Sequence, residues 1–295
     1  MSRTLSRMLG LALLTGLAVS CSKEAVEPAS PAISSQVADA VTATRDNNMA
    51  LGNPSGAQAN TSFYWNYLVN KSQFSMSYHR DRGTPNWVSW HLSSAWLGST
   101  PRQDNFASDN SLPSGWYRVT SSSYTGSGFD RGHNAPSADR TGSVADNSAT
   151  FLMTNMMPQA PNNNQRAWAN LENYCRTLVN AGNELYIITG SYGKGGTGSA
   201  GYKTTLDQGR VTVPARCWKV VVVLPVGTND AARVTTSTRV IAIDTPNDNS
   251  ISTTWGTYRT SVNAIEQATG YDLLSAVAAS VQTTIEAKVD NGPTS

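Results

Sequence analysis

Histidine and cysteine are scarce in this chain, which has three of each among its 295 residues. The sequence contains no HExxH, CxxC or GxSxG motif, so zinc-protease and serine-hydrolase chemistry have no support. Only 14% of the residues are charged, but 39% are hydrophobic, which is enough apolar material for a substantial core. The length allows one large domain or two small ones.

Long hydrophobic runs are also missing. The run Met8–Val19 follows two arginines and is too short to span a bilayer, so residues 1–20 are expected to be an export signal peptide. The order Ala18-Val19-Ser20-Cys21 resembles the lipobox of bacterial lipoproteins, in which the cysteine is lipidated and becomes the new N-terminus. We therefore expect an exported protein that is lipid-anchored to the bacterial cell envelope through Cys21. Ordinary signal-peptide cleavage nearby, which would secrete the protein, is the alternative.

The segment after Cys21 lacks hydrophobic periodicity and is rich in Ala, Ser, Pro and Asn. This composition is typical of a disordered tether, so we assign residues 21–59 to the lipidated cysteine and the tether. The folded domain is then expected at residues 60–290.

Periodicity within the domain predicts both strands and helices. Runs rich in β-branched and aromatic residues indicate strands at 87–92, 185–189, 218–224 and 239–243. Helical patterns occupy residues 165–180, 260–269 and 273–288. These segments mix without regular βαβ alternation, which favours an α+β fold over a doubly wound sheet.

The most informative stretch is Asp130-Arg131-Gly132-His133, because Asn164 follows 31 residues after the histidine and Glu172 eight residues later. Cutting a phosphodiester requires a base that deprotonates water, and positive charge that neutralises the phosphate. Histidine suits the first task, and a divalent cation with arginine suits the second. A carboxamide oxygen near a carboxylate suits Mg²⁺, whereas zinc would require more imidazole or thiolate.

The order of these motifs resembles the DNA/RNA non-specific endonucleases, the ββα-metal nucleases that include secreted bacterial nucleases and mitochondrial endonuclease G. The matching segments are DRGHNAPSAD at 130–139 and TNMMPQAPNNNQRAWANLENYCR at 154–176, with weaker similarity from residue 67 to about 272. The resemblance implies a mixed, largely antiparallel central sheet flanked by helices, with a ββα-metal active-site motif. It also implies a Mg²⁺-dependent endonuclease, with Mn²⁺ able to substitute, that cuts DNA and RNA and leaves 5′-phosphate and 3′-hydroxyl ends.

The resemblance also implies roles for individual residues. His133 corresponds to the general base and Asn164 to the direct metal ligand. Glu172 would orient the metal-bound waters, and Asn155 would support the site.

Three arginines are implied to act on the phosphate. Arg131 and Arg176 correspond to residues that hold it. Arg102, 31 residues before His133, corresponds to an arginine that neutralises its charge. The sequence around Arg102 is variable in the family, so Arg118 is a rival for this role, and an ordinary surface arginine is the plain alternative.

A helix over residues 165–180 places Glu172 and Arg176 four residues apart on one face. Asn164 would then cap the helix, where the dipole favours anions such as phosphate. Without the motif this pair would be taken for a surface ion pair. Asp130 opens a turn and is expected to be structural. The apolar stripe of the helix is expected to be Trp168, Leu171, Cys175 and Leu178.

The charge balance points to local rather than bulk attraction of nucleic acid. The signal peptide holds two of the 22 basic residues, so the mature chain has 20 basic and 20 acidic residues and no net charge. Binding of DNA and RNA must then rest on a local cluster of arginines and the metal. The alternative function is a catalytically idle surface lipoprotein that captures DNA, but a binding protein has no need for a base such as His133.

Several residues have no role in this hypothesis. Cys175 and Cys217 are expected to form either a disulfide or two buried free thiols. The glycine-rich segment 193–198 matches a dinucleotide fingerprint, but no helical pattern follows it, so a flexible loop is expected. His79 and His91 are expected at the surface or in strands.

Overall fold

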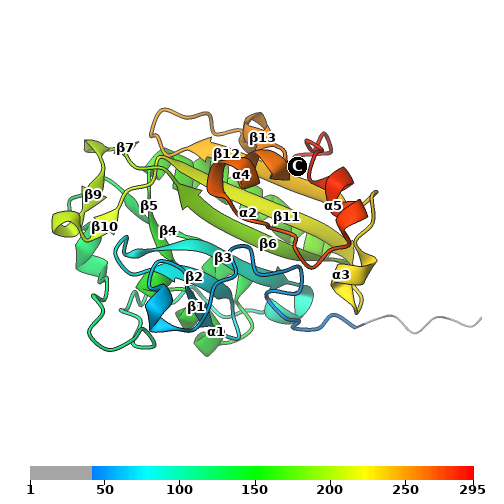
Figure 1. Ribbon diagram of the computed structural model, residues 1–295, viewed down its shortest axis with the longest axis horizontal. Coiled ribbons are helices and arrows are strands. Elements are labelled where there is room, and N and C mark those ends of the chain that lie inside the picture. The colour runs from blue at the N-terminus through cyan, green and yellow to red at the C-terminus, as the bar shows by residue number, and fades with distance from the viewer. Residues whose placement is uncertain (1–41) are drawn as a thin grey trace, which may run out of the picture. The chain divides into compact units, whose positions relative to one another are not determined.

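The computed structural model describes residues 42–295, which form a seven-stranded sheet in the order β1-β2-β3-β6-β11-β12-β13 (Figure 1). Every neighbouring pair of strands is antiparallel, so the predicted α+β fold is confirmed. The expected signal peptide and Cys21 lie outside the described residues. The strands of the sheet are β1 (Tyr67–Asn70), β2 (Ser75–His79), β3 (Thr84–Leu92), β6 (Asn183–Tyr192), β11 (Arg216–Pro225), β12 (Arg239–Pro246) and β13 (Arg259–Thr260).

Three small hairpins and five α-helices surround this sheet. The hairpins pair β4 (Asp130–His133) with β5 (Met156–Gln159), β7 (Gly196–Gly198) with β8 (Gly201–Lys203), and β9 (Thr205–Leu206) with β10 (Val211–Thr212). The α-helices are α1 (Val144–Ala149), α2 (Ala169–Asn180), α3 (Asp230–Arg233), α4 (Val262–Thr269) and α5 (Ala279–Ile285). Within residues 42–295, none of the helices has both the length and the apolar character needed to cross a membrane.

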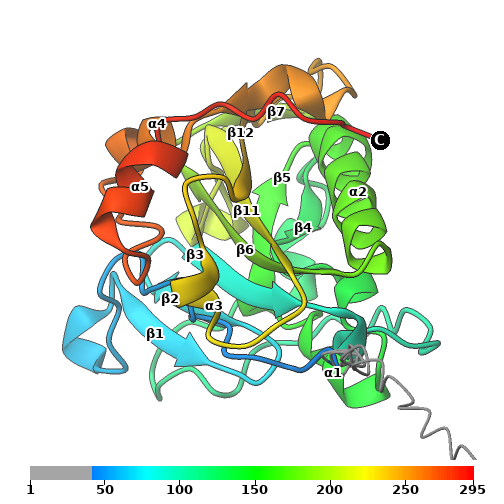
Figure 2. The same ribbon diagram turned by 90° about the vertical axis from the view of Figure 1, so that its right-hand side faces the viewer.

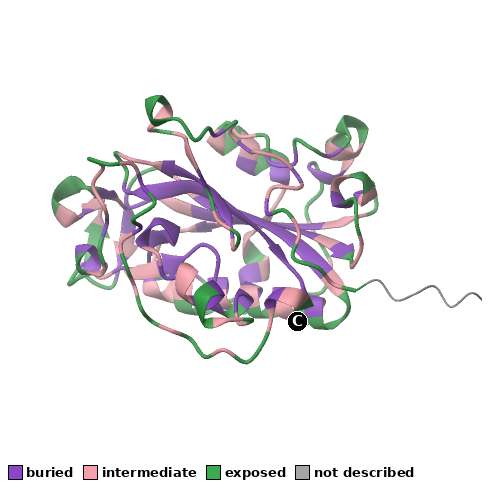
Figure 3. Ribbon diagram, turned by 90° about the horizontal axis from the view of Figure 1, so that it is seen from below, coloured by how far each residue is buried: buried purple, intermediate pink, exposed green. Residues whose placement is uncertain are grey.

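The sheet is buried on both faces (Figure 3). Successive side chains of a strand point to opposite faces, so Trp87 and Trp90 of β3 join different apolar clusters, as do Val220 and Val221 of β11. One face is covered by α2 and the β4–β5 hairpin, and the other by α4, α5 and the segment before β1 (Figure 2). Two-sided burial explains why the central strands read as continuous apolar runs.

The folded part of the chain begins before the expected start at Asn60. Leu51 and Ala57 are 2% and 4% exposed and pack in the same cluster as Trp87. The side chain of Asn48 donates hydrogen bonds to the backbone carbonyls of residues 71 and 72. The expected tether is therefore wrong for residues 42–59. Turns and side-chain-to-backbone bonds hold this segment, and such contacts leave no periodic pattern in the sequence.

Most of the expected secondary structure is present. Residues 165–180 form a π-helical turn, Asn163–Trp168, followed by α2, and residues 260–269 correspond to α4. The expected helix 273–288 is wrong over its first half, because residues 273–278 precede α5 as an irregular segment that buries Leu273 and Leu274 completely. The segment 193–198 is not an isolated flexible loop, because its second half is β7.

A mutation of Leu51 tests the corrected boundary. Leu51→Ala removes a buried side chain and should lower the free energy of unfolding by about 2–5 kcal/mol in a urea titration. The matched control is Val144→Ala, which changes a side chain that is 59% exposed and should shift stability by less than about 0.5 kcal/mol. Equal stability of the two variants would show that residues 42–59 do not belong to the cooperative unit.

Candidate active site

The β4–β5 hairpin and the helix that follows it form the expected ββα arrangement. The DRGH segment makes up β4, with His133 opposite Met156 and Gly132 opposite Met157. A Cβ atom at Gly132 would lie 2.7 Å from the Cβ of Gln159, so the hairpin requires glycine at this position. The chain then leaves β5 and enters the π-helical turn that leads into α2.

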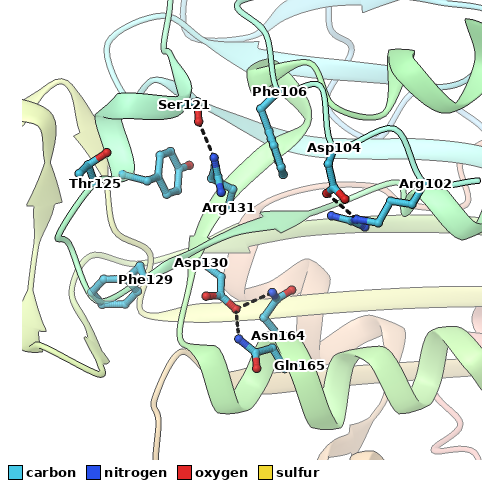
Figure 4. Close-up of a pocket in the computed structure, with 11 residues that line it drawn as sticks. Arg102, Asp104, Phe106, Ser121, Thr125, Phe129, Asp130, Arg131, Asn164 and Gln165 are labelled. Atoms are coloured by element: carbon cyan, nitrogen blue, oxygen red, sulfur yellow. Dashed lines mark hydrogen bonds and ion pairs between the residues drawn. The ribbon is translucent and has the colours of Figure 1, made fainter.

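A pocket of about 390 Å³ opens between this hairpin, the π-helical turn and the loop before residue 107 (Figure 4). It brings together three of the expected site residues, Arg102, Arg131 and Asn164. The other residues that line it are Asp104, Phe106, Ser121, Tyr124, Thr125, Phe129, Asp130 and Gln165.

His133 does not itself line this pocket but packs against Phe106, which does. It is 9% exposed, and its Nε2 has no hydrogen-bond partner among the described residues. Its ring centroid lies 5.7 Å from that of Phe106 and 5.0 Å from that of Phe151. Burial, with the positive charges of Arg102 and Arg131, lowers the pKa of His133 to about 3. The imidazole is therefore neutral near pH 7 and is able to accept a proton.

The two arginines of the pocket each pack on one of the two phenylalanines that contact His133. The guanidinium of Arg102 lies 4.8 Å from the ring centroid of Phe151, and that of Arg131 lies 4.0 Å from that of Phe106. Arg102 also donates to Asp104 Oδ1 at 2.7 Å, and Arg131 donates to the hydroxyl of Ser121. Both positive charges are thus held beside the neutral imidazole.

Arg118 lies elsewhere. Its guanidinium donates to the backbone carbonyls of Asp109 at 3.3 Å and Leu112 at 3.0 Å, and it does not line the pocket. Of the two rival arginines, Arg102 is the one placed beside His133.

Asn164 is held by Asp130, whose Oδ2 accepts hydrogen bonds from Asn164 Nδ2 and Gln165 Nε2, each at 2.8 Å (Figure 4). The expectation that Asn164 caps the helix is wrong, because helical backbone begins at Pro161 and continues through the π-helical turn, so Asn164 lies inside the helix. The amide nitrogen of Asn164 is committed to Asp130, so Oδ1 is the atom left to contact a cation. Asp130 was expected to open a turn, but it is the first residue of β4, where it positions Asn164 and Gln165.

Glu172 and Arg176 lie on α2 and do not line the pocket. They form no surface ion pair with each other, because each has another partner. Glu172 Oε1 accepts from Lys219 Nζ at 3.2 Å, and Asp139 Oδ1 accepts from Arg176 at 2.7 Å. Burial raises the pKa of Glu172, and the Lys219 ammonium acts in the opposite direction.

Asn155 lies behind the site and is fully buried. Its Nδ2 donates to the carbonyls of Ala135 and Thr150, and its Oδ1 accepts from the N–H of Ala135. The two bonds to Ala135 fix the backbone two residues after His133, and the third ties Asn155 to the backbone of Thr150.

Comparison with known proteins accounts for this geometry. A family model described as DNA/RNA non-specific endonuclease matches residues 52–280. The chain belongs to this family. It is a nuclease, a phosphodiester hydrolase of a metal-dependent family.

Individual relatives agree with this assignment. A protein named Nuclease from Nostoc sp. (strain PCC 7120) is 49% identical over 288 residues, which cover 96% of this chain and 98% of that protein. Human mitochondrial endonuclease G is 35% identical over 130 residues, or 43% of each chain. A solved structure of the EndoG/EndoGI complex contains a chain that matches with a TM-score of 0.64 at 23% identity, covering 82% of this chain and 96% of that one, and shows the shared fold.

The residues of the nuclease pocket fit a hard divalent cation. Asn164 offers a carboxamide oxygen and is held in place by the carboxylate of Asp130, and both residues line the pocket. Oxygen ligands supplemented by water are the set that Mg²⁺ and Mn²⁺ accept.

Two residues of this nuclease were missed by the sequence analysis. Lys219 is only 1% exposed, and its Nζ lies 4.2 Å from the ring centroid of Trp168. Asp139 accepts from Trp90 Nε1 at 3.0 Å as well as from Arg176. The available signal for Lys219 was a charged residue inside an apolar strand, because a buried lysine requires a partner.

The residues without an expected role are structural. Cys175 and Cys217 are buried free thiols, which decides between the two alternatives, and burial raises the pKa of Cys175 to about 12. His79 and His91 lie in β2 and β3, as the strand alternative predicted.

Replacing the two rival arginines tests the placement of Arg102 in the nuclease. Arg102→Ala should lower kcat by about 10²–10³ with little change in KM, because a contact that strengthens in the transition state affects turnover. Arg102→Lys should restore activity only partly, since lysine keeps the charge but loses the planar fork. Arg118→Ala should lower the melting temperature and leave kcat near that of the wild type. The reverse pattern in steady-state plasmid cleavage would refute the assignment.

Proposed function

We propose that the protein is a Mg²⁺-dependent endonuclease, with Mn²⁺ as a substitute, that cuts DNA and RNA and leaves 5′-phosphate ends. The observation that carries this proposal is the buried, unpartnered Nε2 of His133 between the charges of Arg102 and Arg131. A protein that only binds DNA would gain nothing from an imidazole kept neutral and unpaired beside two arginines.

His133 would act as the general base. Its neutral imidazole accepts a proton from water at Nε2 as the water oxygen forms a bond to phosphorus. The bond between phosphorus and the 3′ oxygen breaks, and that oxygen takes a proton from solvent to become the 3′ hydroxyl. Burial of the imidazole keeps this base in its neutral form at any pH well above 3 in the cation-free protein.

The arginines and α2 would supply the remaining functions. Arg102 and Arg131 hold the phosphate and neutralise the charge that grows on it, and Arg176 would contribute from α2. Mg²⁺, when bound through Asn164 with waters oriented by Glu172, would supply further positive charge to the phosphate and the leaving oxygen. The bond from Lys219 to Glu172 keeps that carboxylate in one place. Asn155 holds the backbone that carries His133.

Cleavage of supercoiled plasmid and of single-stranded RNA, with Mg²⁺ or with EDTA, tests the proposal. His133→Ala should lower the cleavage rate by about 10²–10⁴ while DNA binding and the melting temperature change little. Asn164→Ala should raise the Mg²⁺ concentration needed for half-maximal rate, and Glu172→Ala should do so less strongly. Near-normal turnover of His133→Ala would refute the mechanism. A wild-type protein that binds DNA but never cuts it would favour the DNA-capture alternative.

We propose further that the nuclease is exported and lipid-anchored to the cell envelope through Cys21. The support is the order of the sequence alone: two arginines, a short apolar run, and small residues before the cysteine.

Cys21→Ser tests this location. The variant should move from the membrane fraction to the soluble exported fraction with its nuclease activity preserved, because the anchor and the pocket are separate parts of the chain. Mass spectrometry of the wild type should show a lipid on the N-terminal cysteine. If the wild-type protein is soluble and carries no lipid, the anchor is refuted and the protein is secreted after ordinary signal-peptide cleavage.

A further inference from the structure

Three carboxylates converge where α4, the segment after it and the end of α5 meet. Glu266 belongs to α4, Asp272 to the segment after it, and Glu286 directly follows α5. One oxygen from each carboxylate lies within 4.8 Å of the others. Three like charges at this distance repel one another unless a cation or a proton lies among them.

Glu286 is the residue that points to a bound cation. It is 6% exposed, and its Oε1 has no hydrogen-bond partner among the described residues. A buried carboxylate oxygen without a partner is costly, so the cluster as it stands lacks a group. Burial, with the charges of Glu266 and Asp272, raises the pKa of Glu286 to about 7.

No basic side chain within residues 42–295 forms an ion pair with these three carboxylates. Lys288, which is close to Glu286 in sequence, donates instead to the carbonyl of Thr236. Glu266 Oε1 accepts a hydrogen bond from the N–H of Leu273, which leaves Oε2 able to contact a cation.

We propose that Glu266, Asp272 and Glu286 form a binding site for a calcium ion. An all-oxygen set without histidine or cysteine suits a hard cation rather than zinc. Oxygens that share one Ca²⁺ at roughly 2.3–2.6 Å lie at most roughly 4.6–5.2 Å apart, and Ca²⁺ accepts irregular coordination where Mg²⁺ demands a near-ideal octahedron. The three carboxylate oxygens lie within 4.8 Å of one another, which is close enough to share one such ion, and waters would complete its coordination.

A second group of possible ligands, Asp46, His91 and Glu184, is already satisfied and serves as a contrast. His91 Nδ1 accepts from the N–H of Asp46, and its Nε2 lies 3.4 Å from Glu184 Oε2. Glu184 also accepts from Arg233 and from the N–H of Gly227. A cation there would have to displace existing bonds, whereas in the carboxylate cluster it supplies a missing one.

The calcium ion would stabilise a layer of the fold that is separate from the catalytic pocket. It would join α4, the segment after it and the end of α5, which cover the sheet face opposite α2. The segment between these helices is bonded to the N-terminal part through the carbonyls of Leu51 and Pro54. Calcium should therefore raise stability without changing the cleavage mechanism.

Thermal unfolding of the full mature chain tests the site. Addition of about 5 mM Ca²⁺ to EDTA-treated protein should raise the melting temperature by about 3–8 °C, and Mg²⁺ should have a smaller effect. Glu266→Gln and Glu286→Gln should each abolish most of this rise. Without calcium, neither variant should melt below the wild type, because each removes like-charge repulsion. If a carboxylate had only a structural role, its Gln variant would melt below the wild type without calcium, and calcium would not change that difference.

A direct probe and a matched control locate the ion. Tb³⁺, which replaces Ca²⁺, should luminesce on excitation of the protein because Tyr271 adjoins Asp272, and Ca²⁺ should quench this emission by competition. Asn164→Ala, at the catalytic pocket, should retain both the luminescence and the rise in melting temperature. Loss of both in Asn164→Ala, or their persistence in the two Gln variants, would overturn the proposal.

The remaining outcome is a shared proton in place of the cation. A carboxylic acid whose folded-state pKa is raised loses stability as pH rises from its unfolded value toward its folded value. In EDTA the melting temperature of the wild type should then fall between about pH 5 and about pH 8, and that of Glu286→Gln should fall less. If Ca²⁺ at about pH 8 does not reverse this fall, the cluster holds a proton and the calcium site is refuted.

Discussion

Every buried backbone group needs a hydrogen-bond partner, and the catalytic loops meet this requirement through a few buried polar side chains. Arg140 is fully buried and donates to the carbonyls of Gln73, His91 and Asp139, so it attaches the segment after His133 to the sheet. Asn155 holds the same segment from the side of β5.

Asn247 is a third buried side chain that bonds to backbone groups, at the end of the hairpin after β5. Its Oδ1 accepts from the N–H of Ala160, and its Nδ2 donates to the carbonyls of Pro158 and Pro214. The hairpin and the π-helical turn are therefore fixed to the edge of β12. A site that must hold its groups to within a fraction of an ångström depends on such rigid attachment.

Positive charge is gathered at one site in this protein, although the chain as a whole has little net charge. The chain has a formal net charge of only +2, yet Arg102 and Arg131 lie against two phenylalanine rings beside one neutral imidazole. Glu172 of α2 and Lys219 of β11 form a buried ion pair, and the Lys219 ammonium lies against Trp168. Taking such a pair out of water is unfavourable, so its presence is better explained by positioning of the carboxylate than by stability.

The two faces of the sheet have different tasks. One face supports α2 and the hairpin, where the pocket is built, and the other is closed by α4, α5 and the N-terminal segment. The buried sheet separates the layer of α4, α5 and the N-terminal segment from the pocket. A change that stabilises this layer therefore need not move the residues of the pocket. The carboxylate cluster lies in that second layer.

The sequence by itself determined the family, the α+β class, the central strands and the segments that meet in the site. The DRGH motif and the spacing of Asn164 and Glu172 can be read directly from the order of residues. Strand and helix periodicity likewise shows which face of a local segment is buried. It also narrowed the phosphate-neutralising arginine to two candidates and the cysteines to two states.

Only the tertiary structure decided between those candidates. Arg102 rather than Arg118 lies beside His133, Lys219 joins Glu172 across 47 positions of the chain, and Asn164 bonds to Asp130 instead of capping a helix. The order of residues 42–59 was likewise set by contacts with distant strands. These features depend on pairings between residues far apart in the chain, and periodicity, which reports the burial of a local face, does not record which distant group covers it.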